Sequence, residues 1–192
     1  MSDTPVDNSK RTWLIASGCA GAVGGVATAV PFVSTFQPSE RAKAAGAAVE
    51  VDISALKPGE KLTVEWRGKP VWVVKRTKQT LDALAAHDDK LRDPASDEPQ
   101  QPDYAHNGYR SIKPEIFVAV GICTHLGCSP SYLPDSFGEQ VQGVTSGFFC
   151  PCHGSTYDMA GRVYKGVPAP LNLEVPPYKY ISDSVVVIGE LA

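Results

Sequence analysis

The sequence predicts a mainly β domain that follows one apolar N-terminal helix. The chain has 192 residues, which is enough for one medium-sized domain with some length left over. Its 17 glycines and 16 prolines favour short strands joined by turns over long helices. The additional length lies at the front, where residues 13–36 carry no charge. We therefore expect one membrane-spanning helix and one β-rich domain.

The uncharged segment, 13–36, is long enough to cross a lipid bilayer. As a helix it would span about 36 Å, at about 1.5 Å per residue, against roughly 30 Å of hydrocarbon. The apolar region of a cleaved signal peptide is only about 7–15 residues long, so we favour a retained anchor. Residues 42–44, AKA, are similar to a cleavage site, and processing stays open as the alternative. We expect Cys19, inside the segment, to be a small packing residue.

The charges beside this span do not set its orientation. Lys10 and Arg11 precede it and two basic residues follow it, so the positive charges are balanced. Residues 9–15, SKRTWLI, resemble a twin-arginine export signal in which lysine replaces the first arginine. On this basis we expect residues 1–12 to be a cytoplasmic tail. The β-rich domain would then lie in the periplasm, anchored in a bacterial inner membrane.

Short strands account for most of the remaining chain. Residues 37–50 are small and of mixed charge, which predicts a flexible tether. Runs rich in β-branched and aromatic residues predict strands at 49–53, 61–66, 71–75, 116–121, 147–149, 162–164 and 185–188. Three apolar residues at helical spacing predict a short helix over 80–86. Residues 88–113 are rich in Asp, Pro and Gln, and we expect an irregular surface excursion there.

The net charge argues against one class of function. It is -3 at pH 7, and the isoelectric point is about 5.8, whereas nucleic-acid surfaces are usually basic. We therefore expect no nucleic-acid partner. His87 and His106 stand alone in or beside the excursion, and we assign them no role.

Two short stretches contain most of the residues that can bind a metal. Four of the five cysteines and two of the four histidines lie in CTHLGC, 123–128, and CPCHGS, 150–155. A zinc site would typically pair C-x2-C with H-x3-H, and would leave two thiols without a purpose. A thiol–disulfide enzyme typically has C-x-x-C, a spacing that CPC lacks. A two-iron cluster in which two histidines replace two cysteines on one iron accounts for these residues better.

Both stretches resemble the cluster-binding boxes of the Rieske iron–sulfur subunits of ubiquinol–cytochrome c reductase, the respiratory cytochrome bc complex. The resemblance covers essentially the whole chain: anchor, tether, β-rich head and both boxes. Residues 167–170, VPAP, resemble the proline loop of this family, with valine in place of glycine. The resemblance implies a Rieske-type antiparallel β head over 51–192, with a small cluster-binding subdomain within 121–170.

The resemblance also implies the ligands of a [2Fe-2S] cluster. Two cysteines would bind one iron and two histidines the other. These four metal ligands are Cys123, Cys150, His125 and His153. The remaining pair, Cys128 and Cys152, would form a disulfide between the two loops. Four thiolates would give the oxidised site a net negative charge, whereas two thiolates and two neutral imidazoles leave it neutral. A neutral site accepts an electron more readily, so this ligand set implies a raised potential.

Further roles follow from positions that match the family. Ser155 and Tyr157 match the hydroxyl residues that bond to a bridging sulfide and a ligand thiolate, which favours the reduced state. The apolar cover of the cluster and the docking tip would be formed by Leu126, Gly127, Pro168, Ala169 and Pro170. Quinol would contact His153 or His125, whose outer ring nitrogen could accept a proton.

The implied function is that of a catalytic redox subunit. It would accept one electron, with a coupled proton, from ubiquinol and pass the electron to a c-type cytochrome. Its partners would be the cytochrome b and c-type cytochrome subunits of a complex that we expect to be dimeric. The small Rieske subunit of another periplasmic oxidase and that of a plastoquinol-oxidising complex stay open as alternatives. Soluble Rieske carriers and oxygenase domains usually lack the anchor and the additional cysteine pair, which counts against that class.

Overall fold

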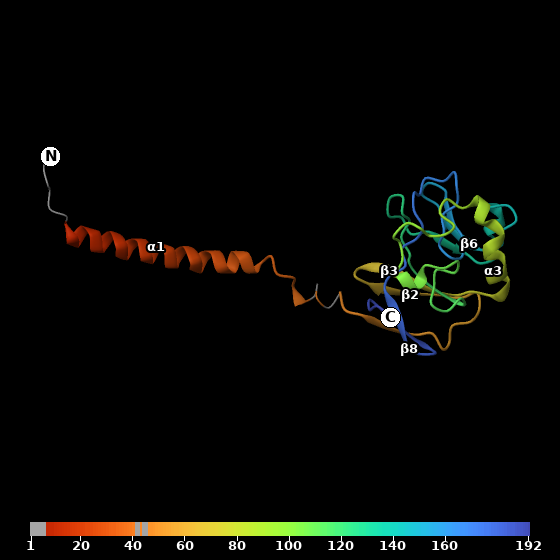
Figure 1. The fold of residues 1–192 in the computed structure, drawn as a ribbon, viewed down its shortest axis with the longest axis horizontal. Coiled ribbons are helices and arrows are strands. Elements are labelled where there is room, and N and C mark those ends of the chain that lie inside the picture. Colours follow the sequence, from red (N-terminus) through yellow and green to blue (C-terminus); the bar gives the residue numbers. More distant parts are fainter. Residues whose placement is uncertain (1–6, 41–42, 44–45) are drawn as a thin grey trace. The chain divides into compact units, whose positions relative to one another are not determined.

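The computed structural model describes residues 7–40, 43 and 46–192. The chain divides into two compact units, Met1–Ala44 and Ala45–Ala192. The first contains α1, Asn8–Ser34, which is long and apolar enough to cross a membrane (Figure 1). Its side chains are all exposed within the chain. The predicted span is therefore present as a helix.

The helix α1 begins before the predicted span. The side chain of Asp7 accepts hydrogen bonds from the backbone N–H groups of Ser9 and Lys10, and so caps the first turn. The predicted tail, 1–12, is consequently helical from Asn8 onward. Part of the predicted tether, 37–50, lies outside the described residues, and the end of the tether belongs to the first strand of the second unit.

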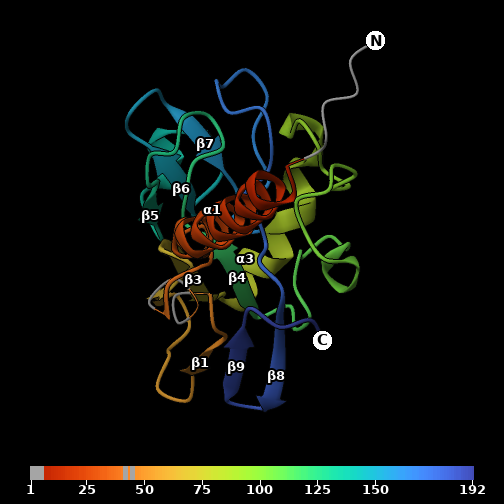
Figure 2. The ribbon, with the colours of Figure 1, turned by 90° about the vertical axis from the view of Figure 1, so that its left-hand side faces the viewer.

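Three antiparallel sheets of three strands each build the second unit (Figure 2). The first sheet contains, in spatial order, β1 (Val49–Asp52), β9 (Val185–Ile188) and β8 (Tyr178–Ser182). The second contains β2 (Lys61–Trp66), β3 (Lys69–Lys75) and β4 (Ile116–Val120). The third contains β5 (Ser131–Leu133), β6 (Gly147–Cys150) and β7 (Ser155–Tyr157). The mainly β, antiparallel prediction is confirmed.

The second and third sheets share one core. All five residues of β4 are buried, so both faces of this strand are covered although it lies at the edge of its sheet. Trp72 of β3 stacks on Phe148 of β6, with ring centroids 5.1 Å apart. Gly121, directly after β4, lies so close to this indole that a Cβ atom would come within 2.2 Å of it. The absence of a side chain at this position lets the chain leave β4 beside the third sheet.

Short helices occupy the connections. The helix α3, Lys78–Ala83, is capped by Thr77, whose side chain accepts a hydrogen bond from the backbone of Thr80. It continues as the 3-10 helix η1, Leu84–Lys90, so the predicted helix over 80–86 is present but longer and only partly α-helical. The other two 3-10 helices among the described residues are η2, Asp103–Ala105, and η3, Phe137–Glu139.

One predicted strand, 162–164, is wrong. Within it, Val163 and Tyr164 form only isolated bridges, with Tyr157 and Leu91 respectively. The backbone N–H of Val163 donates to the side-chain Oδ1 of Asn172 at 2.8 Å rather than to a neighbouring strand. A side chain has replaced the strand partner, which the pattern of Val and Tyr does not reveal.

The excursion, 88–113, is irregular as predicted, but it is not confined to the surface. Leu91, Ala105 and Arg110 have no exposed area. Leu91 packs with Phe137 and Tyr164 in a second, smaller core. The strands β5, β7 and β8 were not predicted; β5 and β7 are only three residues long and give little periodic signal.

Candidate metal centre

Hydrogen bonds within the first box fold it into a tight loop after β4. The backbone N–H of Cys123 donates to the carbonyl of Cys128 at 2.7 Å, and that of Gly127 donates to the carbonyl of Cys123 at 3.1 Å. Gly127 has a φ of 83°, in the left-handed region that glycine adopts without strain. These contacts bring both ends of the box together and direct its middle residues outward.

The second box is the turn between β6 and β7. Cys150 ends β6 and pairs with Ser155, the first residue of β7. The N–H of Gly154 closes the turn by donating to the carbonyl of Cys150 at 2.9 Å. The hairpin therefore brings Cys150 into the interior and leaves the middle of the box at its tip.

A disulfide joins the two boxes. It connects Cys128 with Cys152, as the resemblance implied, and their Cα atoms are 6.7 Å apart. The Sγ atom of Cys150 lies within 4.8 Å of both disulfide sulfurs. Since those two sulfurs are bonded to each other, they are not available as thiolate ligands, and only Cys150 of the three can bind a metal.

Each box contributes one thiol and one imidazole to the four predicted ligands. Cys123 and Cys150 are buried and free of disulfide bonds. His125 is half-buried and His153 is exposed, and their ring centroids are 4.7 Å apart with the planes nearly perpendicular. The thiols thus form the inner side of the site and the imidazoles its outer side. Among the described residues, the Nδ1 atom of His125 is one of the few buried polar side-chain atoms without a hydrogen-bond partner.

The surroundings of Cys123 favour its thiolate. Burial alone would raise the pKa of Cys123, but hydrogen bonds led by that of Tyr157 bring this pKa below its usual value. Burial raises the pKa of the neighbouring Cys150. A thiolate is the form of cysteine that binds metal.

Tyr157 lies against the inner side of the site. Its Oη atom is 3.2 Å from Cys123 Sγ and accepts a hydrogen bond from the backbone N–H of Thr124 at 3.1 Å. The hydroxyl of Thr124 donates to the carbonyl of Leu171 at 2.7 Å, so its proton is not directed at Tyr157. The proton of the Tyr157 hydroxyl then has two acceptors within reach, Cys123 Sγ and Thr124 Oγ1, each 3.2 Å from Oη. Thr124 was missed by the sequence reasoning, although it lies between two proposed ligands.

Ser155 connects the second box with the proline loop. Its side chain has no exposed area, and its Oγ atom accepts a hydrogen bond from the backbone N–H of Ala169 at 3.1 Å. The hydroxyl proton remains available for an acceptor on the site. Pro168 and Pro170, on either side of Ala169, are exposed.

The outer side of the site is apolar and uncharged. Leu126, in the middle of the first box, is 72% exposed. Gly127, the next residue, is also exposed, and so is His153 in the second box. Neither box contains a charged residue. The arrangement can present an imidazole to a partner through an apolar contact.

Comparisons with known proteins agree with this geometry. The Rieske [2Fe-2S] domain family matches residues 103–178. The ubiquinol–cytochrome c reductase iron–sulfur subunit of Allochromatium vinosum is 54% identical, over 99% of this chain and 93% of its own length. The protein of the same name from Bradyrhizobium diazoefficiens is 44% identical, over 94% of each chain. A chain of a hyperthermophilic respiratory complex III has a similar structure, with a TM-score of 0.50 and 28% identity, over 90% of this chain and 97% of its own.

Proposed function

Because the chain belongs to the family of ubiquinol–cytochrome c reductase iron–sulfur subunits, we propose that Cys123, His125, Cys150 and His153 hold its Rieske [2Fe-2S] cluster. The observation that carries this assignment is that two loops joined by a disulfide contain two buried free thiols and two adjacent imidazoles. A cluster of this type has two cysteine and two histidine ligands.

The residues fit the cluster in kind as well as in number. The two thiols are buried and free, and His125 Nδ1 is buried without a partner, as expected of atoms placed for a metal. When bound, the cluster supplies a site that takes up and releases one electron. Tyr157 and Ser155 present hydroxyl protons on its inner side, and such hydrogen bonds strengthen as negative charge accumulates.

The exposed tip is suited to docking. We assign contact with ubiquinol to His153, because it is the more exposed of the two imidazoles, with Leu126 as an apolar contact beside it. The quinol would be held by a cytochrome b subunit, and a c-type cytochrome would be the next partner. The full complex would be a dimer. In these roles the chain is a catalytic redox subunit.

The disulfide supports a location outside the cytoplasm. Bonds of this kind persist in oxidising compartments such as the bacterial periplasm and are rare in the cytosol. With Cys128–Cys152 in the second unit and the candidate span α1 in the first, we assign the N-terminus to the cytoplasm and the β-rich unit to the periplasm. The chain would then cross the inner membrane once.

Single replacements of the ligands test the proposal. His153→Ala, assayed in membranes that contain the complete complex, is expected to abolish both the Rieske EPR signal and quinol-dependent reduction of cytochrome c. His106→Ala is the matched control, since this imidazole lies on the surface of the excursion and is expected to leave both unchanged. A normal EPR signal in the His153→Ala variant would remove His153 from the ligand set.

A further inference from the structure

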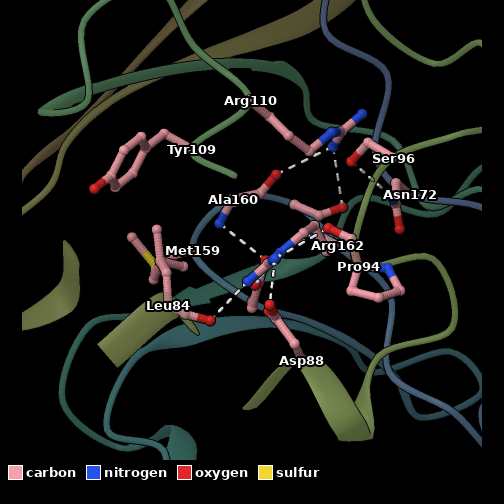
Figure 3. Close-up of polar contacts among 12 residues, drawn as sticks. Leu84, Asp88, Pro94, Ser96, Tyr109, Arg110, Met159, Ala160, Arg162 and Asn172 are labelled. Atoms are coloured by element: carbon pink, nitrogen blue, oxygen red, sulfur yellow. Dashed lines mark hydrogen bonds and ion pairs between the residues drawn. The ribbon is translucent and has the colours of Figure 1, made fainter. Parts of the chain in front are cut away.

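Two buried arginines join the excursion to the turn that follows β7 (Figure 3). The side chain of Arg162 is 2% exposed, and its Nε atom donates to Asp158 Oδ2 at 2.8 Å. Its Nη1 atom donates to Asp88 Oδ1 at 2.8 Å and to the carbonyl of Pro94 at 3.2 Å, and Nη2 donates to the carbonyl of Leu84 at 2.8 Å. One guanidinium thus holds η1 and the start of the excursion against the turn, 158–162.

The second arginine makes the reciprocal contact. Arg110 belongs to the excursion and has no exposed area. Its Nη1 atom donates to the carbonyl of Ala160 at 3.1 Å, and Nη2 donates to the carbonyl of Leu173 at 2.8 Å and to Gln101 Oε1 at 2.8 Å. Its φ of 49° is unusual for a residue other than glycine and persists only where the surroundings fix it. Each segment therefore inserts one arginine into the other.

The turn between the two arginines is closed and tightly packed. Asp158 Oδ1 accepts hydrogen bonds from the backbone N–H groups of Ala160 and Arg162 at 2.9 and 2.8 Å. Gly161 has a φ of 70°, and a Cβ atom there would come within 2.8 Å of the Phe117 ring. The turn consequently has little room to take up another shape while both arginines are in place.

This turn lies directly behind the candidate metal centre. Asp158 follows Tyr157, whose hydroxyl contacts Cys123 Sγ. On the other side of the turn, the N–H of Arg92 donates to the carbonyl of Val163 at 2.9 Å, so the excursion continues along the segment that leads into the proline loop. A change in the turn would move the backbone that carries the tyrosine.

Stability alone is a weak reason for such an arrangement. Burial lowers the pKa of Arg110 to about 10, so it stays charged at neutral pH and its desolvation must be offset by its carbonyl partners. Buried ion pairs such as Arg162–Asp158 can often be replaced by apolar side chains without loss of stability. A role in positioning the turn explains the two buried arginines better than stability does.

We propose that Arg162 and Arg110 are positioning residues that hold the Tyr157 hydroxyl on Cys123 Sγ, and thereby set the redox potential of the centre. The inference rests on the proposed function of the centre, because it concerns the potential of the cluster bound there. The excursion is then a support for the electron-transfer site.

Two conservative substitutions distinguish an effect of the Tyr157 position on the redox potential from a direct effect of charge. Arg162→Lys keeps the positive charge but loses the fork that reaches several acceptors at once. Asp158→Asn removes a negative charge near the centre, which by electrostatics alone would raise the potential. If the position of the Tyr157 hydroxyl sets the potential, both variants lower it. An unchanged potential in Arg162→Lys, together with a raised potential in Asp158→Asn, would overturn the proposal.

The measurement is an EPR-monitored redox titration of the full chain in its complex. In a double-mutant cycle, Arg162→Lys is expected to lower the potential in the wild-type background and to have no further effect in a Tyr157→Phe background. An equal, additive shift in both backgrounds would show that the arginine does not act through Tyr157. If Arg162→Lys does not accumulate, Arg110→Lys carries the same test, since Arg110 holds the same turn.

Limited proteolysis gives a second measurement that does not depend on the cluster. Trypsin is expected to cleave Arg162→Lys faster within the excursion, after Lys90 or Arg92, because the segment is released from the turn. An unchanged cleavage rate together with a lowered potential would contradict the proposal that Arg162 holds the excursion against the turn. The matched control is Val186→Ala, a buried position in β9 of another sheet, which is expected to lower stability and leave the potential unchanged. Quinol oxidation by the wild-type complex reports on the proposed function separately.

Discussion

At the scale of single residues, the proposed tuning of the centre depends on the hydroxyl groups around the two buried thiols. Tyr157 accepts a hydrogen bond from the backbone of Thr124, and the acceptors within reach of its own proton are Cys123 Sγ and Thr124 Oγ1. Ser155 accepts a hydrogen bond from the backbone of Ala169 and keeps its proton free. Both side chains are buried, so water does not compete for these protons.

Tyr157→Phe should therefore lower the potential while leaving the cluster bound. A hydrogen bond to a charged group contributes about 1.5–3 kcal/mol, and only the part that differs between redox states counts. A tenfold change in a one-electron equilibrium corresponds to about 59 mV, so we expect a fall of tens of millivolts, up to about 100 mV. Ser155→Ala should shift the potential in the same direction.

A redox titration of the two variants measures this effect. Tyr178→Phe is the matched control: this buried tyrosine of β8 accepts a hydrogen bond from the backbone of Ile112, and its loss should affect stability alone. A potential that is unchanged or higher in Tyr157→Phe would show that its hydroxyl does not donate to the sulfur.

At the scale of elements, the disulfide between the two boxes is expected to hold the site together. Cys128 and Cys152 are 24 residues apart, and closing a loop of this length stabilises a chain by about 3.5 kcal/mol in the chain-entropy model. Replacing both cysteines with alanine should lower the melting temperature and reduce the iron retained per chain. Iron retention equal to that of the wild type after heating would contradict this role.

Packing behind β4 gives an independent prediction. Gly121→Ala would place a methyl group within 2.2 Å of the Trp72 indole, and the tryptophan cannot yield without disturbing its stacking on Phe148. Overpacking of this kind typically costs about 1–3 kcal/mol, and we expect that loss in urea-induced unfolding. Gly108→Ala, where no atom lies within 4 Å of the added carbon, is the control. Equal stability of the two variants would refute the close contact.

The sequence predicted the elements that depend on local pattern. Alternating and apolar runs located β2, β4 and β9, and the resemblance of both boxes to those of the Rieske family supplied the ligand candidates. The strand predicted at 162–164 failed because an asparagine side chain takes the hydrogen bond that a strand would have supplied. Strands as short as β7 produce too few alternations to be recognised.

The support behind the site could not be predicted in the same way. Arg110 binds mostly backbone carbonyls and Arg162 binds two of them, and since every residue has a carbonyl, the sequence holds no signal for these partners. The excursion, 88–113, has the composition of a surface loop, although its arginine is the most enclosed charge of the network. Contacts of this type depend on the tertiary fold.

At the scale of the whole molecule, the account requires the β-rich unit to deliver electrons between two partners. The predicted tether, 37–50, should permit this movement. Several prolines placed between positions 37 and 48 are expected to slow quinol–cytochrome c turnover and to leave the EPR spectrum and the potential unchanged, because the site itself is untouched. Stopped-flow reduction of the cytochrome measures the rate. Normal turnover with a stiffened tether would mean that movement is not needed.

The central claim is that the centre has two cysteine and two histidine ligands. Pulsed EPR of the reduced full-length chain tests it most directly, because nitrogen nuclei bound to the cluster modulate the electron spin echo. We predict couplings from two imidazole nitrogens, contributed by His125 and His153. Absence of any nitrogen coupling in a chain with a full complement of iron would contradict the ligand set, and with it the account of how this protein binds its cluster.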